Sequence, residues 1–530
     1  QADGDIIINA NLSGTDGDTF NIVMNSDANN GDDDGAVILN ANITTFGGDL
    51  TINTTAGNAA GEGINQTGGI ITSAGAVSLT AGAAAISLGQ NNAITGAIAA
   101  ANSGGNAITI KNTAATTTTG AINAAGNGAV NLTVEDITIG AAGITGGAVT
   151  ITDNDGGGIA LGAATDADGV QISGAELQNI TSSAATELVT GGIVTVNNVT
   201  AANTNTMTST TIDAVGEVTF ETASATFNAL TVESDTAVTI DIGVAADTGA
   251  LNIDADTNNT ADGGDDRIDI ATGLTLSAKT SMQLDATTGG ITFAGTGTLN
   301  AEGGITIANA VTATAGNITI DADVDDDGTG TFTNSAAFNA AGRTLDITAG
   351  TVDFNGTVAA ATLNITDSDG GGIGLGAAAV DDFRLSGAEL QQVTTTTLME
   401  LITAGGVTVN GITATNSNTV NTLTIDAVGT ILFATGASTF NALTVEADGE
   451  VDANINVTTD TGALAIDADD DNNAATGDGR LDIATGVQLA SKTTLTLDAT
   501  EGGIVFAGTG TLNAEGGITI ANAVTATAGN

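Results

Sequence analysis

An exact internal repeat constrains this chain more than any other feature of its sequence. The segment FAGTGTLNAEGGITIANAVTATAGN occupies 293–317 and occurs again, letter for letter, at 506–530, which is 213 residues later. The same spacing relates Arg267 to Arg480 and Lys279 to Lys492, so the duplication covers most of the second half. Such a repeat indicates a tandem-repeat architecture, in which copies stack on one another instead of forming separate globular domains.

The repeat sets the expected division of the chain. We expect N-terminal solenoid coils over 1–104, a first copy of a 213-residue tandem super-repeat over 105–317 and a second over 318–530, all in one continuous rod. The chain begins without Met and stops at a copy boundary. We therefore expect it to be a segment of a longer protein, with any leader removed or lying outside it.

Short apolar triplets with a polar middle residue recur along the chain, as in Val130-Asn131-Leu132 and Val149-Thr150-Ile151. This period of two is typical of β-strands, and the Gly, Asn and Asp between the triplets are turn residues. Strong triplets often lie about 19 to 24 residues apart, which predicts an all-β parallel β-solenoid of about 20 residues per coil. The absence of Pro agrees with this fold, because each interior strand needs its N–H groups for pairing.

Composition limits both the core and the partners of the chain. It has no Trp, Tyr, His or Cys, so the core is thin and the commonest metal ligands and general base are missing. Seven basic residues face 61 acidic ones, for a net charge of −54. This balance excludes nucleic acid as a partner, since phosphates demand Lys and Arg. No apolar run approaches the roughly 18 residues of a membrane span.

Four runs illustrate the repeating pattern: GAVILNANITTFGGDLTI, AGAVSLTAGAAAISLGQNN, GAVTITDNDGGG and GNITIDADVDDDGTGTF. They resemble the repeat regions of filamentous-haemagglutinin-like exoproteins and related bacterial surface adhesins. The resemblance implies a right-handed parallel β-helix that is exported to the cell surface or the extracellular matrix. It further implies a structural or adhesive filament, with surface glycans or neighbouring cells as partners. Since solenoid coils continue without a cap, we also expect head-to-tail self-association into fibres.

A glycan-processing enzyme is the alternative function, because parallel β-helices also carry polysaccharide lyases and hydrolases. Lyases need a basic residue and hydrolases a carboxylate pair with aromatic platforms. Lys111 and Arg384 are among the basic residues without a partner in the other copy, although Arg384 beside Asp381 and Asp382 suits a surface ion pair. Since so little proton-transfer machinery is present, the non-catalytic interpretation is preferred.

Calcium is the one metal that the sequence suggests, and no cofactor is required. Asp323, Asp325 and Asp327 before Gly328 have the D-x-D-x-D-G spacing that begins a calcium loop. Asn334 stands where such a loop would carry a bidentate Glu. Looser acidic clusters lie at Asp27 with Asp32 to Asp34, at Asp153 with Asp155, at Asp254 with Asp256, and at Asp467 to Asp471. The alternative is that Asp and Asn simply end strands in local turns.

Overall fold

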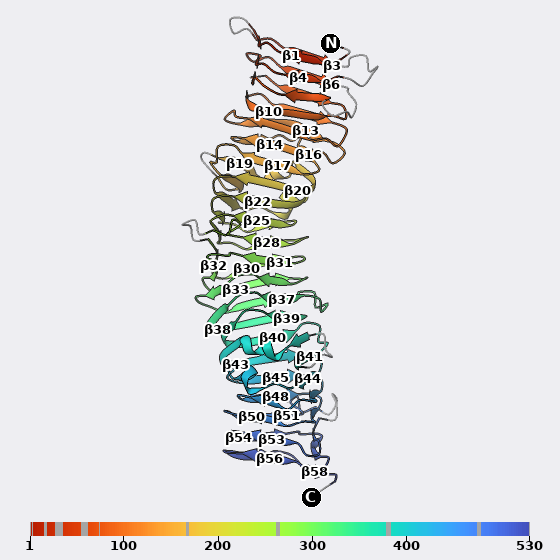
Figure 1. Ribbon diagram of the computed structural model, residues 1–530, viewed down its shortest axis with the longest axis vertical. Helices are drawn as coiled ribbons and strands as arrows, with labels where there is room; N and C mark the ends of the chain where they lie inside the picture. Colours follow the sequence, from red (N-terminus) through yellow and green to blue (C-terminus); the bar gives the residue numbers. More distant parts are fainter. Residues whose placement is uncertain are drawn as a thin grey trace. The chain divides into compact units, whose positions relative to one another are not determined.

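The computed structural model describes residues 2, 4–14, 19–26, 35–54, 62–73, 75–165, 169–260, 266–377, 383–473 and 479–528. Strands dominate it, and the strand pairs within these residues are parallel, as the sequence predicted. The chain forms two compact units, Gln1–Ile268 and Asp269–Asn530. Each unit is a parallel β-solenoid in which strands from successive coils lie side by side (Figure 1).

In the first unit the strands form ladders, each strand pairing with its counterpart in the next coil. The longest ladder runs through β1 (Ile6–Ile8), β4 (Val37–Leu39), β7 (Gly63–Gln66), β10 (Ala85–Ile94), β12 (Ile108–Asn112), β14 (Val130–Val134), β17 (Val149–Asp153), β20 (Ile180–Thr190), β22 (Met207–Ala214), β25 (Leu230–Ser234) and β28 (Leu251–Asp254). A second runs through β3 (Ile22–Ser26), β6 (Leu50–Thr54), β9 (Val77–Ala81), β11 (Ile98–Asn102), β13 (Thr117–Ala124) and β16 (Ile144–Gly146). Shorter ladders join β2 (Leu12–Ser13), β5 (Ile43–Thr44) and β8 (Ile71–Ser73), then β19 (Val170–Ser173), β18 (Ile159–Gly162), β21 (Val194–Asn197), β23 (Val218–Phe220) and β26 (Ala237–Ile240), and β24 (Ala225–Phe227) with β27 (Val244–Ala246).

The second unit is built in the same way. Its longest ladder runs through β30 (Leu274–Ala278), β33 (Gly297–Ala301), β36 (Ile318–Asp321), β38 (Phe338–Ala349), β40 (Val358–Asp367), β43 (Val393–Thr403), β45 (Leu423–Ala427), β48 (Leu443–Ala447), β51 (Leu464–Asp467), β54 (Thr494–Asp498) and β57 (Gly517–Ile520). Another runs through β42 (Phe383–Leu385), β41 (Ile373–Gly376), β44 (Val407–Asn410), β46 (Ile431–Phe433), β49 (Val451–Ala453), β52 (Arg480–Ile483), β55 (Gly503–Phe506) and β58 (Val524–Ala526). Shorter ladders join β31 (Met282–Asp285), β34 (Ile305–Ile307), β37 (Thr331–Asn334) and β39 (Thr351–Phe354), then β32 (Gly290–Phe293) and β35 (Val311–Ala313), and β47 (Ser438–Phe440), β50 (Val457–Thr459), β53 (Gln488–Ser491) and β56 (Thr511–Ala514).

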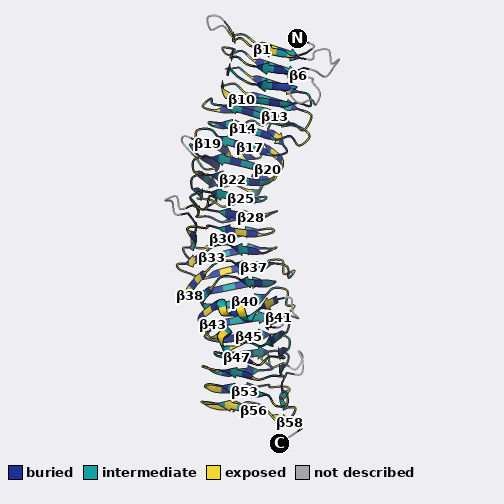
Figure 2. Ribbon diagram, in the orientation of Figure 1, coloured by how far each residue is buried: buried dark blue, intermediate teal, exposed yellow. Residues whose placement is uncertain are grey.

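Strand register sets the length of each coil. Leu423 pairs with Leu443 and Leu443 with Leu464, so these two coils hold 20 and 21 residues, close to the predicted length. Val130 pairs with Val149, the pair of triplets that the sequence analysis placed one coil apart. Along such strands buried and half-buried residues alternate (Figure 2). Aliphatic side chains therefore fill the interior, and Thr, Asn, Asp or Glu lie outside.

Two long coils each contain a short helix. Val149 pairs with Thr186, 37 residues on, and Leu363 pairs with Met399, 36 residues on. The inserted helices are α1 (Gly174–Leu177) and α3 (Gly387–Gln392), each followed one coil later by α2 (Ala201–Thr204) or α4 (Ala414–Ser417). A capping box starts α1, because Ser173 accepts from the Glu176 N–H and the Glu176 carboxylate accepts from the Ser173 N–H, as Ser386 and Glu389 do in α3.

Candidate cation site at the acidic turns

The predicted calcium loop forms a sharp turn after β36. Ala322 and Asp323 are fully buried, and the Val324 N–H donates to the Ala301 carbonyl of the preceding coil at 3.1 Å. The Asp326 N–H then donates to the Asp323 carbonyl at 3.0 Å, with Asp326 in the left-handed region at φ 54°. The likeness to a calcium loop ends at Gly328, because Asn334 lies in β37 and its amide donates to the Ala336 carbonyl.

The turn gathers the three carboxylates that the sequence singled out. Asp325 and Asp327 are exposed and Asp323 is buried, and one carboxylate oxygen of each lies within 4.8 Å of the others. Oδ2 of Asp323 accepts from the Gly328 N–H at 2.8 Å and from the Ser368 hydroxyl. Oδ1 of Asp323 is also buried but accepts no hydrogen bond. A carboxylate trio of this kind offers hard oxygen ligands, the type that Ca²⁺ and Mg²⁺ prefer.

The environment separates the pKa values of the two exposed acids. Desolvation, and then the charge of Asp327, raise the pKa of Asp325 above its ordinary value. The Thr329 hydroxyl and N–H both donate to Asp327 and lower the pKa of that carboxyl. The two exposed carboxyls are therefore shifted in opposite directions, although only one residue separates them.

The looser acidic clusters have different structures. Asp153 is buried and accepts from the Gly158 N–H at 2.9 Å and the Thr190 hydroxyl at 2.7 Å, so it closes a turn as the alternative interpretation predicted. Asp256 and Asp469 are buried in turns like that of Asp323. The clusters at Asp27 and at Asp32 to Asp34 lie outside the described residues.

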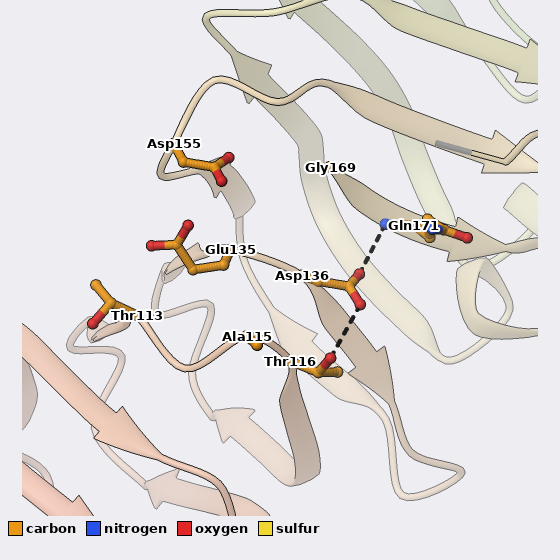
Figure 3. Close-up of a pocket in the computed structure, with 8 residues that line it drawn as sticks. All are labelled: Thr113, Ala115, Thr116, Glu135, Asp136, Asp155, Gly169 and Gln171. Atoms are coloured by element: carbon orange, nitrogen blue, oxygen red, sulfur yellow. Dashed lines mark hydrogen bonds between the residues drawn. The ribbon is translucent and has the colours of Figure 1, made fainter. Parts of the chain in front are cut away.

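An acidic pocket of about 520 Å³ in the first unit was missed from the sequence. Its lining comprises Thr113, Ala115, Thr116, Glu135, Asp136, Asp155, Gly169 and Gln171 (Figure 3). Asp136 accepts from the Gln171 N–H at 3.0 Å and from the Thr116 hydroxyl at 3.3 Å. The Glu135 and Asp155 carboxyls face one another. Burial raises the pKa of Glu135, whereas the Gly157 N–H lowers that of Asp155.

The second unit carries different residues at the positions of this pocket. The Arg384 N–H donates to the Thr351 hydroxyl, as the Gln171 N–H donates to Asp136 in the first unit. Thr351 therefore replaces Asp136, Gly350 replaces Glu135, and Arg384 replaces Gln171. The only sign of this pocket in the sequence is that the two copies differ in charge at these positions.

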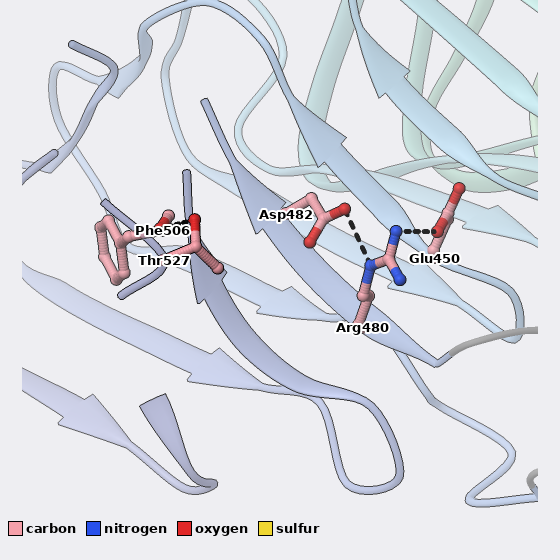
Figure 4. A network of polar contacts seen from close by, with 5 residues as sticks. All are labelled: Glu450, Arg480, Asp482, Phe506 and Thr527. Atoms are coloured by element: carbon pink, nitrogen blue, oxygen red, sulfur yellow. Dashed lines mark hydrogen bonds and ion pairs between the residues drawn. The ribbon is translucent and has the colours of Figure 1, made fainter. Parts of the chain in front are cut away.

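Basic residues in the second unit form ion pairs between coils. Lys279 contacts Glu302, and Lys492 contacts Glu515 at 2.6 Å, each pair joining residues 23 apart. Arg480 lies between Asp482 at 2.8 Å and Glu450 at 3.8 Å (Figure 4). Lys279, Lys492 and Arg480 are thus each paired with a carboxylate. Asp381 and Asp382, the expected partners of Arg384, lie outside the described residues.

A column of acidic side chains follows the outer face of the longest ladder in the second unit. Register stacks Asp426, Glu446, Asp467 and Asp498 on one another in successive coils. The first unit has the same arrangement at Asp213, Glu233 and Asp254. Partial burial, and then the charges of neighbouring carboxylates, raise the pKa values of Asp426, Glu446, Asp213 and Glu233. Stacking these carboxylates in register thus lowers the stability of the protein when they are ionised, because like charges repel one another.

We expect the protein to be more stable at about pH 5 than at pH 7.5. A carboxyl whose pKa is raised on folding contributes stability that is fully present below its unfolded pKa and is lost as pH rises through its folded pKa. Melting followed by circular dichroism across this range would measure the trend. Glu446→Gln should raise the melting temperature at pH 7.5 by about 2 °C and weaken the pH dependence, whereas Glu221→Gln, at an exposed site outside the column, should do neither. Stability that rises steadily towards pH 7.5 would contradict this.

No protein-family model, curated protein or solved structure matches this chain. Among the described helices, none is long and apolar enough to cross a membrane.

Proposed function

We propose that this chain is a non-catalytic structural or adhesive filament protein of a bacterial surface or biofilm matrix. The observation that supports it is that the same interior pattern recurs from coil to coil within each unit. Paired strands place Ile, Val, Leu or Phe inside at the same positions in one coil after another, with short polar side chains outside. This construction gives a long, regular surface stabilised only by contacts between neighbouring coils.

Head-to-tail association into fibres is part of the proposal. Each coil presents a row of backbone donors and acceptors that the next coil satisfies, and a second copy can supply the same groups. Electron microscopy of the native product should show fibres, and antibodies should label intact cells. Deleting the protein should reduce adhesion to surface glycans or to neighbouring cells. Labelling only after lysis, with unchanged adhesion, would contradict the proposal.

A polysaccharide-processing enzyme is the second candidate, and the pocket in Figure 3 is the observation that favours it. Opposite pKa shifts on two facing carboxyls are a known arrangement for acid and base roles. Against this, the chain has no Trp or Tyr to bind a sugar ring.

Activity assays can distinguish the two candidates. Incubation with acidic and neutral polysaccharides, followed by assays for new reducing ends and for unsaturated uronates, should show no turnover by the filament protein. Turnover that is lost in Glu135→Gln, Lys111→Ala or Arg384→Ala would instead establish the enzyme.

A further inference from the structure

Three turns share one backbone conformation. Comparing them shows that the Asp323 turn does not need its exposed acids to form. Each begins Asp-Ala-Asp, with the second Asp buried: Asp256, Asp323 and Asp469. Three residues later a residue with positive φ donates its N–H to the carbonyl of the buried Asp; these residues are Asn259 (φ 53°), Asp326 (φ 54°) and Asn472 (φ 50°). The first turn reads Thr257-Asn258-Asn259-Thr260 after its buried Asp. The backbone therefore forms without acids at these positions.

The buried carboxylate of the first turn, which we call the neutral turn, differs from that of the Asp323 turn, which we call the acidic turn; Oδ1 of Asp469 in the third turn is unpaired as in the acidic turn. In the neutral turn, Oδ1 of Asp256 accepts from the Thr260 N–H at 3.2 Å. In the acidic turn, Oδ1 of Asp323 accepts no hydrogen bond, although the residue is fully buried. A buried carboxylate oxygen without a partner is costly, and a bound cation would offset that cost.

Asp325 and Asp327 bring further carboxylate oxygens to within 4.8 Å of the Asp323 carboxylate. Oxygen ligands at about 2.4 Å from a shared Ca²⁺ lie no more than about 4.8 Å from one another. We propose that Asp323, Asp325 and Asp327 bind one divalent cation of the calcium class, with the buried Asp323 as its inner ligand. This site does not depend on the proposed filament function.

The charges around the turn favour a cation. Gly328, at φ 78°, leaves room for the carboxylate of Asp369, since a Cβ at 328 would lie 2.4 Å from Asp369 Oδ2. Lys279 is held by Glu302 and lies within electrostatic range of Asp325. Its single charge therefore faces several carboxylates. Hard oxygen ligands on a turn select Ca²⁺ over metals that prefer His or Cys, and their flexible spacing suits Ca²⁺ better than the octahedral Mg²⁺.

Calorimetric titration of the chelator-treated full chain with CaCl₂, at physiological salt, tests the proposal. The wild type should show one saturable Ca²⁺ site above the weak background of a highly acidic protein, and Mg²⁺ should bind more weakly. The double variant Asp325→Asn with Asp327→Asn should weaken this site by about tenfold or more. Ca²⁺ should also raise the melting temperature of the wild type and leave that of the double variant unchanged.

Asp326→Asn is the matched control, because it removes one exposed charge from the same turn without touching the three carboxylates. Asn is compatible with the left-handed backbone there, as Asn259 and Asn472 show. Asp326→Asn should change Ca²⁺ affinity by less than about twofold. Equal weakening by Asp326→Asn and by the double variant would reduce the effect to diffuse charge and overturn the site, as would the absence of a saturable Ca²⁺ isotherm in the wild type.

Discussion

The Phe433→Ala variant should lose about 3–5 kcal/mol of stability in the coils around β46. Phe433 is fully buried and stacks between Val409 of the preceding coil and Ala453 of the next. Since the core of a coil is thin and Ala453 is small, little can move in to fill the space that the ring leaves. The loss should therefore lie in the upper part of this range.

Hydrogen exchange of the backbone amides measures where this loss falls. In a solenoid each coil contacts its neighbours only, so faster exchange should be concentrated in β44, β46 and β49, with distant coils of the second unit little affected. Phe46→Ala is the control, since Phe46 is 44% exposed, and it should cost less than about 0.5 kcal/mol. A melting temperature that is the same for Phe433→Ala and wild type would contradict the packing described for β46.

The fold could be predicted because the contacts between coils of a solenoid repeat at a spacing that is visible in the sequence. A triplet such as Val130-Asn131-Leu132 shows both the strand period and, through Val149-Thr150-Ile151, the coil length, and these two strands do pair in register. The helices in the long coils could not be predicted in this way, because α1 has only four residues and α3 six, too few to show a helical period. The Ser-Gly-Ala-Glu capping boxes at Ser173 and Ser386 were the available signal for α1 and α3.

The candidate cation site could be predicted in part. Alternate acids before Gly328 suggested that Asp323, Asp325 and Asp327 converge, and the structure confirms that their carboxylates do. Which of them is buried depends on another coil, because the partner Ser368 lies 45 residues away and two coils on. The acidic column has the same origin: Glu446 and Asp467 are 21 residues apart, and only strand register shows that they stack. Contacts between coils thus determine which carboxylates are buried and which lie next to one another, and the spacing along the sequence does not show this.

The Thr439→Pro variant should destabilise the coils around β47 by about 3 kcal/mol. Thr439 points outward and is half-buried, so its side chain contributes little to the core. Its N–H donates to the Ile412 carbonyl of the preceding coil at 2.8 Å. Proline removes this donor and leaves the Ile412 carbonyl without it, and its ring occupies the space between the two coils.

Thr439→Val is the matched control, because it keeps the N–H and has nearly the same shape as Thr, and it should stay within about 0.5 kcal/mol of wild type. Melting followed by circular dichroism would compare the three proteins. The same test can be made in the first unit, where the Thr226 N–H donates to the Val199 carbonyl at 2.8 Å. Thr226→Pro should have a similar effect there. If both proline variants have the melting temperature of the wild type, backbone pairing between coils is not the reason that Pro is absent from all 530 residues of this chain.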